Sequence, residues 1–295
     1  MNRREFLGLT AGAVGAATVG SGCSLFSGEP PRILFGACRG LGDVPLMKEL
    51  GYDFFENGVG GMLVPDKSDD EWARQRDAIL AAPLPLRSCN GFLPGRFRLT
   101  GPKASFAEPL AYAEKACRRA DEVGMKTIVF GSGGARNAPA GYPKEKAVAQ
   151  FTEFCRRLAL RIAGCHVTVV LEPLQPKEAN FLNFVREGVR ICRAVGSPRI
   201  CVLADIFHME QGGEGAASIV VAGKWLKHCH IAEKGTRTAP GLKTDGSEFA
   251  PYFEALKSIG YAGGVSCECG WGDKKDFAKN LANALATMKR LAGQA

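Results

Sequence analysis

The sequence predicts a single (β/α)8 barrel of the TIM type, and three observations lead to this prediction. Eight short runs rich in β-branched and apolar residues alternate with segments of helical length. The runs follow one another at intervals of mostly about 25 to 40 residues, the length of one βα unit. No linker rich in Ser, Pro or Gly divides the chain after residue 30, so roughly 265 residues remain for one domain. A doubly wound sheet is the alternative, but eight evenly spaced units favour closure.

The predicted elements follow one another in order along the chain. The strands cover residues 33–38, 52–57, 86–90, 126–131, 167–172, 200–205, 226–231 and 264–268. Ser68 with Glu71, and Ser105 with Glu108, form capping-box patterns that predict the starts of two helices. Residues 144–163 carry apolar side chains at helical spacing, which predicts a helix packed against the sheet. These side chains are Ala147, Phe151, Phe154, Leu158 and Ile162.

The composition is that of an ordinary globular protein. The chain has 295 residues, of which 46% are hydrophobic and 23% charged, and this excludes a disordered or fibrous protein. No run of about twenty strongly apolar residues occurs, so a polytopic membrane protein is excluded as well. The formal net charge of +8 is spread among Lys and Arg of predicted helices and loops. We therefore expect these cations to lie on a solvated outer surface.

The first thirty residues are predicted to be a leader, and residues 31–295 to be the barrel. Arg3 and Arg4 precede Phe6, Leu7 and a Gly/Ala-rich stretch, which resembles a twin-arginine export signal. Cys23 follows Gly-Ser-Gly, similar to a degenerate lipoprotein cleavage site, and is a candidate for lipidation. We expect an exported protein of the periplasm or cell envelope, with Cys23 as its one candidate membrane anchor. A buried N-terminal helix is the alternative.

Ten cysteines follow Cys23, an even number that permits disulfides without requiring them. Most of them lie inside apolar runs, where cysteine acts as a small buried hydrophobic residue. Cys267 and Cys269 alternate with Glu268 and are expected to face the helices. No CxxC pair occurs, so a zinc ribbon has no support.

Metal-competent side chains stand at the ends of the last four predicted strands. In a barrel of this type, catalytic groups gather where the strands end. An ionised carboxylate that closes an apolar run is costly to bury unless it is paired or bound to a cation. We therefore predict one divalent metal ion held by Glu172, Asp205, His230 and Glu268. Three carboxylates and one imidazole suit Mn²⁺ best, Co²⁺ or Mg²⁺ less well, and Zn²⁺ prefers more nitrogen or sulfur.

For other polar residues near strand ends, the sequence leaves two roles open. His228 and Glu233 flank His230 on the same strand, but His230 lies nearer the strand's carboxyl end than His228. His228 is expected to stack one layer below or to bond a neighbour. Three further strands end in Glu56, Asn90 and Ser132, which either line the pocket or cap loops. Phe207 and Trp271 either form apolar walls of the pocket or pack beside the barrel loops without contacting a substrate.

These residues lie within motifs that extend over the whole predicted barrel. The motifs are NGFLPGRFRLTGP, VFGSGGARNAP, LEPLQPKEANFLN, LADIFHM, HCHIAEKGTRTAPG and VSCECGW. Their order and spacing resemble the xylose-isomerase-like barrels of the sugar phosphate isomerase/epimerase type, which include ketose 3-epimerases. The resemblance implies a sugar or keto-sugar substrate. It also implies that Glu172 and Glu268 are both metal ligands and the acid/base pair.

The resemblance assigns substrate binding to Glu178, His208 and Arg237. Two departures affect the pocket rather than the metal ligands. The family's Asn-Arg after the first glutamate is Gln175-Pro176-Lys177 here, and Arg237 stands one residue further from His230 than usual. The sequence therefore defines the type of reaction better than it defines the sugar substrate.

Several alternatives remain open from the sequence. Other enzymes would use the same two carboxylates: a hydroxypyruvate isomerase, an aldose–ketose isomerase or an inosose dehydratase-like enzyme. A sugar-binding envelope protein would keep the barrel without catalysing a reaction. An apurinic endonuclease would need further histidines at early strand ends, whereas none of the 4 histidines precedes His166. The chain has no dense run of Lys and Arg of the kind that binds the phosphates of a nucleic-acid backbone, so we expect no nucleic-acid partner. A homo-oligomer is left open.

Overall fold

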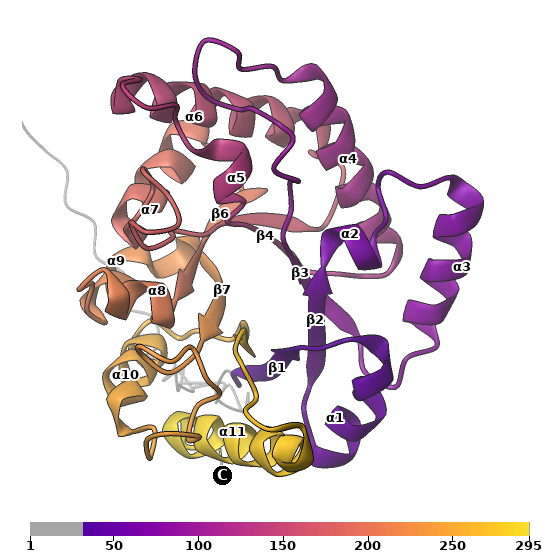
Figure 1. Cartoon of the computed structure of the whole chain (residues 1–295), viewed down its shortest axis with the longest axis vertical. Coiled ribbons are helices and arrows are strands. Elements are labelled where there is room, and N and C mark those ends of the chain that lie inside the picture. Colours follow the sequence, from indigo (N-terminus) through magenta and orange to yellow (C-terminus); the bar gives the residue numbers. More distant parts are fainter. Residues whose placement is uncertain (1–31, 295) are drawn as a thin grey trace, which may run out of the picture. The chain divides into compact units, whose positions relative to one another are not determined.

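The computed structural model describes residues 32–294 and shows eight parallel strands closed into a barrel (Figure 1). Each strand pairs with the next along the chain, and the first pairs with the last. The strands are β1 (Leu34–Cys38), β2 (Phe54–Gly58), β3 (Leu86–Asn90), β4 (Thr127–Phe130), β5 (Thr168–Leu171), β6 (Ile200–Asp205), β7 (Leu226–Ile231) and β8 (Gly264–Cys267). The predicted fold class is confirmed, and every predicted strand end lies within two residues of the observed one.

Helices connect the strands and surround the barrel (Figure 1). They are α1 (Val44–Leu50), α2 (Val59–Met62), α3 (Asp69–Leu80), α4 (Ala107–Glu122), α5 (Gly133–Arg136), α6 (Lys144–Arg161), α7 (Val185–Val195), α8 (Ile206–Gln211), α9 (Ala217–Ala222), α10 (Ala250–Ser258) and α11 (Phe277–Ala292). The five apolar side chains predicted to face the sheet from residues 144–163 are all buried. Burial of this stripe explains why α6 forms along its predicted length.

The two predicted capping boxes have different outcomes. At α3, Ser68 Oγ accepts from the Glu71 backbone N–H at 3.2 Å and Glu71 Oε2 accepts from the Ser68 N–H at 3.1 Å. The box at Ser105 is wrong, because α4 begins at Ala107 and has no side-chain cap. The Ser105 N–H donates to Arg98 O at 3.0 Å, and the Phe106 ring packs edge-on against Phe154. These contacts hold Ser105 in the preceding loop.

The barrel interior has an apolar part and a charged part. Val129, Val170, Cys201 and Leu203 form a cluster that is separate from the larger core between strands and helices. Further toward the carboxyl ends of the strands, Glu56, His228 and His230 are also buried. The charged groups are thus gathered at the end of the barrel where the βα loops begin.

The cysteines of the described residues are unpaired, which leaves the ten cysteines after Cys23 as thiols. Cys267 faces the helices as predicted, because its Sγ lies 3.7 Å from Met288 Sδ of α11. No helix between residues 32 and 294 is long and apolar enough to cross a membrane. The predicted leader and Cys23 lie outside the described residues.

Candidate active site

The four predicted metal ligands lie together at the carboxyl end of the barrel. Glu172 follows β5, Asp205 ends β6, His230 lies in β7 and Glu268 follows β8. Each offers one ligand atom, and these atoms all lie within 4.8 Å of one another. Parallel strands bring their carboxyl ends to one edge, so residues far apart in the chain become neighbours.

Each of these side chains has one donor or acceptor atom directed to the common centre. His230 Nδ1 lies 3.1 Å from Glu172 Oε1 and 3.7 Å from Glu268 Oε2. Asp205 Oδ1 caps α8 by accepting from the backbone N–H groups of Phe207 at 2.8 Å and His208 at 3.3 Å. The second Asp205 oxygen carries none of these backbone bonds and is available to a cation.

The electrostatics of the cluster favour a bound cation. Burial raises the pKa of Glu172, and the neighbouring charges of Glu268 and Asp205 raise it further. Burial also raises the pKa of Asp205, to about 6. Three carboxylates in one buried place repel one another, and a divalent ion would relieve this repulsion. The oxygen-rich donor set fits Mn²⁺, Co²⁺ or Mg²⁺ better than Zn²⁺.

Glu56 is the residue whose place differs most from expectation. It neither lines the pocket nor caps a loop: it is fully buried, with Oε1 2.9 Å from His230 Nε2 and Oε2 2.8 Å from His228 Nε2. Burial alone would raise the pKa of Glu56, but the two imidazoles bring it well below its usual range. Burial alone would likewise lower the pKa of His230, yet Glu56 and Glu268 keep it well above its usual value. Glu56 therefore fixes the ring that presents Nδ1 to the site.

We expect Glu56→Gln to weaken Mn²⁺ binding by about 10- to 100-fold. The amide keeps the shape of the side chain but removes the negative charge that orients and polarises His230. Calorimetric titration with Mn²⁺ measures the change, with the exposed Glu254→Gln on α10 as the matched control. Equal affinity in the two variants would contradict this role.

His208 presents an unused donor to the site. Its Nδ1 accepts from the Gln175 backbone N–H at 3.4 Å, so the proton lies on Nε2. Nε2 is buried and has no hydrogen-bond partner within residues 32–294, although Asp205 and Glu178 oxygens lie 3.6 and 3.9 Å away. Burial lowers the pKa of His208, which favours the neutral ring. A neutral N–H donor of this kind suits a carbonyl or hydroxyl oxygen.

Arg237 reaches the site from the segment between β7 and α10. Its Nη2 lies 2.6 Å from Glu268 Oε2, its Nη1 lies 3.4 Å from Glu178 Oε1, and its guanidinium stacks 4.9 Å over the Phe207 ring. Asn90 Nδ2 donates to the other Glu268 oxygen at 2.7 Å. Asn90 thus lines the site. Phe207 contributes indirectly, because its ring packs against the Arg237 guanidinium.

Buried Glu233 holds the Arg237 segment in place and is not one of the four clustered ligands. Its carboxylate accepts from the backbone N–H groups of Leu242, Lys243 and Thr244 at 2.9 to 3.1 Å. These bonds fix the loop from Glu233 to Thr244. Within this loop the backbone of Arg237 adopts a positive φ of 50°. Ser132 stabilises the loop after β3, because its Oγ accepts from the Leu93 N–H at 2.9 Å.

Two residues beside Glu172 were not anticipated from the sequence. Arg136 is fully buried in α5, and its guanidinium donates to Gly131 O at 2.6 Å, Glu172 O at 3.2 Å, Leu182 O at 3.4 Å and Phe181 O. Burial lowers the pKa of Arg136 to about 10, while the Glu172 charge opposes this. A Cβ on Gly131 would collide with Glu172 Oε2. Arg136 therefore holds the backbone of Glu172, and Gly131 leaves the room that its carboxylate occupies.

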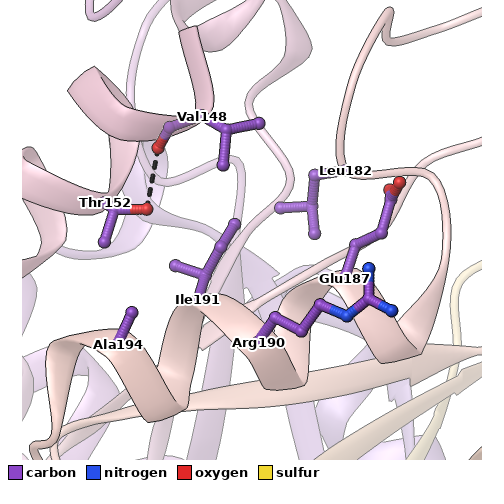
Figure 2. Close-up of a pocket in the computed structure, with 7 residues that line it drawn as sticks. All are labelled: Val148, Thr152, Leu182, Glu187, Arg190, Ile191 and Ala194. Atoms are coloured by element: carbon purple, nitrogen blue, oxygen red, sulfur yellow. Dashed lines mark hydrogen bonds between the residues drawn. The ribbon is translucent and has the colours of Figure 1, made fainter. Parts of the chain in front are cut away.

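A separate hollow between α6 and α7 shows none of this chemistry (Figure 2). Its volume is about 310 Å³. Leu182 and Ile191 are among its apolar lining residues, and Thr152 donates to Val148 O at 2.7 Å within it. Its polar groups are exposed at the rim or already hydrogen-bonded. We therefore place the candidate active site at the carboxyl end of the barrel and not in this hollow.

A profile of the xylose isomerase-like TIM barrel matches residues 44–291. The chain belongs to this family. One family relative, the "Probable ketose 3-epimerase" of Synechocystis sp. (strain ATCC 27184 / PCC 6803 / Kazusa), is 25% identical over 65% of this chain and 67% of its own length. The L-ribulose 3-epimerase of Methylomonas sp. (strain DH-1) is 31% identical over 46% of each chain. The chain thus spans about two thirds of the first relative and less than half of the second.

Solved structures with the same barrel fold include two sugar-enzyme structures of similar size. The D-psicose 3-epimerase from Clostridium cellulolyticum H10, solved with D-tagatose, superposes with a TM-score of 0.78. It is 19% identical to this chain, and the match covers 88% of this chain and 99% of that one. This similarity shows the fold, while the sequence relatives support a sugar isomerase or epimerase.

Proposed function

We propose that the protein is a divalent-metal-dependent ketose 3-epimerase. The observation that carries the proposal is the placement of Glu172 and Glu268 on different strand ends, both within 3.7 Å of His230 Nδ1. Two carboxylates around one centre can work on opposite faces of a substrate carbon. The relatives described above, a ketose 3-epimerase and an L-ribulose 3-epimerase, support the same class of substrate.

Epimerisation next to a ketone requires one proton to leave and another to arrive from the opposite face. We assign these transfers to Glu172 and Glu268, one as general base and the other as general acid. The raised pKa of buried Glu172 brings it closer to neutral pH, where a carboxylate can exchange protons most effectively. A divalent ion bound by the four ligands would supply electrostatic stabilisation of the negative charge that develops on the substrate oxygens.

The remaining polar groups hold the sugar. His208 Nε2–H and the Arg237 guanidinium are donors suited to the oxygen on which charge develops in the enediolate. Glu178, which is 39% exposed, can accept from a sugar hydroxyl at the mouth of the site. The Gln175-Pro176-Lys177 departure bears on the choice of sugar, because Gln175 donates to His208 Nδ1 at 3.4 Å and to Glu178 Oε1 at 2.8 Å.

The proposal extends to the location of the enzyme, which the predicted leader would direct to the cell envelope. The twin-arginine pattern at Arg3 and Arg4 would export the folded enzyme, and lipidation of Cys23 would hold it at a membrane. In that location a free or oligosaccharide-derived ketose is a more accessible substrate than a sugar phosphate.

Conversion of free ketopentoses and ketohexoses by Mn²⁺-loaded protein tests the proposal. We expect chromatography to show the C3 epimer of at least one ketose, and we expect chelation to abolish conversion and Mn²⁺ to restore it. Aldose products would instead indicate an aldose–ketose isomerase, and sugar binding without turnover would indicate a sugar-binding envelope protein. No conversion, with no metal recovered by elemental analysis, would refute the enzyme.

The site gives little support to an apurinic endonuclease. Of the histidines in residues 32–294, His166 lies on the surface beside Asp121 at 3.3 Å, and His228 is occupied by Glu56. Only His230 belongs to the four-residue ligand cluster. Cleavage of an abasic-site duplex would overturn this reading.

A further inference from the structure

Cations that are scattered in the sequence collect in a pocket at the amino-terminal end of the barrel. Arg87 is the second residue of β3, Lys126 immediately precedes β4, and Lys227 is the second residue of β7. Lys224 lies in the turn just before β7. All four line one pocket with a volume of about 420 Å³. This end is opposite to the one that carries Glu172 and Glu268.

The Lys and Arg side chains of this pocket have no acidic partner among residues 32–294, although Asp121 Oδ2 lies 3.3 Å from another lining residue, His166. None of the lining residues is Asp or Glu. Asp53 is a carboxylate whose charge acts on Arg87, but its oxygens are already bound by Arg32 at 2.7 Å and by the Phe35 N–H at 2.8 Å. A basic pocket of this kind has a net attraction for anions.

A buried hydroxyl in the same pocket also lacks a partner. Thr127, the first residue of β4, lines the pocket and is only 5% exposed. Its Oγ1 makes no hydrogen bond to any described residue. A buried polar atom without a partner costs free energy, so a ligand that supplies an acceptor would be favoured there.

We propose that this pocket binds a phosphate group. Three lysines and one arginine around a concave surface offer point charges and a planar fork of donors, the combination that phosphate oxygens accept. The phosphate can come from an anionic phospholipid headgroup or from a free phosphorylated molecule. This inference goes beyond the proposed epimerase, whose ligands lie at the other end of the barrel.

The course of the chain favours the headgroup. Arg32, the first described residue, leads into β1 at this same end of the barrel. Cys23 lies nine residues before Arg32, a span of at most about 30 Å when extended. A lipid on Cys23 would therefore tether the barrel by the end that carries the pocket and leave the sugar site facing away.

Titration of the full chain with inorganic phosphate tests the pocket. Cys23→Ser is included throughout so that no attached lipid contributes. We expect one phosphate bound per chain, with affinity that falls as salt rises, and at least about tenfold weaker binding in Lys126→Gln/Lys227→Gln. Lys146→Gln/Lys279→Gln removes the same charge from exposed positions on α6 and α11 and should bind like the parent. Thr127→Val should weaken binding while keeping the side-chain volume.

Co-sedimentation with vesicles separates the two sources of phosphate. Binding to phosphatidylglycerol but not to phosphatidylcholine vesicles, lost in Lys126→Gln/Lys227→Gln, would support the headgroup. Phosphate binding without vesicle binding would support a free ligand. Absence of both, or binding that the pocket variants leave unchanged, would overturn the proposal. Ketose conversion should be the same in all these variants, so this test does not depend on the proposed function.

Discussion

Glu172→Gln is expected to lower kcat for ketose epimerisation by about a thousandfold. The amide cannot exchange the substrate proton, while its shape still fits between His230 and the Gly131 backbone. Steady-state kinetics with Mn²⁺-loaded protein measure the loss. Glu268→Gln should produce a loss of the same order, because each direction of the reaction needs one base and one acid.

Two controls make this result specific to proton transfer. Glu254→Gln makes the same chemical change on the exposed side of α10 and should leave kcat unchanged. Metal content is measured in every variant, so that a lost ligand is distinguished from a lost acid or base. A metal-loaded Glu172→Gln protein with a kcat within tenfold of the parent would contradict the assignment.

Arg136→Met is expected to lower the free energy of unfolding by about 3 to 5 kcal/mol. The substitution leaves four buried backbone carbonyls without their shared donor, including that of Glu172. Urea unfolding followed by circular dichroism measures the change. Arg193→Met on the exposed side of α7 is the matched control and should change stability by less than about 0.5 kcal/mol.

A loss below about 1 kcal/mol in Arg136→Met would show that the carbonyls find other partners. The same protein, if it remains folded, also reports on positioning. Because Arg136 holds the backbone of Glu172, we expect kcat to fall while KM changes little. An unchanged kcat in the folded variant would limit Arg136 to a structural role.

The fold and the four clustered ligands could be predicted because both follow from local pattern and simple topology. Strand and helix periodicity repeats eight times, and parallel strands deliver their carboxyl ends to one edge. Glu172, Asp205, His230 and Glu268 therefore had to approach one another once the barrel was assumed. Their approach does not depend on the conformation of any loop.

The supporting residues depend on contacts that periodicity does not encode. Glu56 meets His228 and His230 across the barrel, between strands that are not neighbours in the sheet. Arg136 finds its carbonyls, and Glu233 its backbone N–H groups, only in folded loops. The alternatives for Glu56 therefore missed its role as partner to two histidines.

The basic pocket was hidden for a similar reason. Its cations are separated by more than a hundred residues in the chain, from Arg87 to Lys227, so no charged run marks them. Lys126, Lys224 and Lys227 are exposed, as expected of a solvated outer surface, but together with Arg87 they line one pocket instead of being dispersed. Closure of the barrel brings the amino ends of β3, β4 and β7 around one cavity.

Deuterium incorporation is the most direct test of a ketose 3-epimerase. Mn²⁺-loaded protein is incubated in D₂O with each ketose of the panel, and the recovered sugar is analysed by NMR. We expect deuterium at carbon 3, since Glu172 and Glu268 exchange their protons with solvent between turnovers. Deuterium at carbon 1 or 2 alone, or no deuterium in any sugar, would contradict a 3-epimerase.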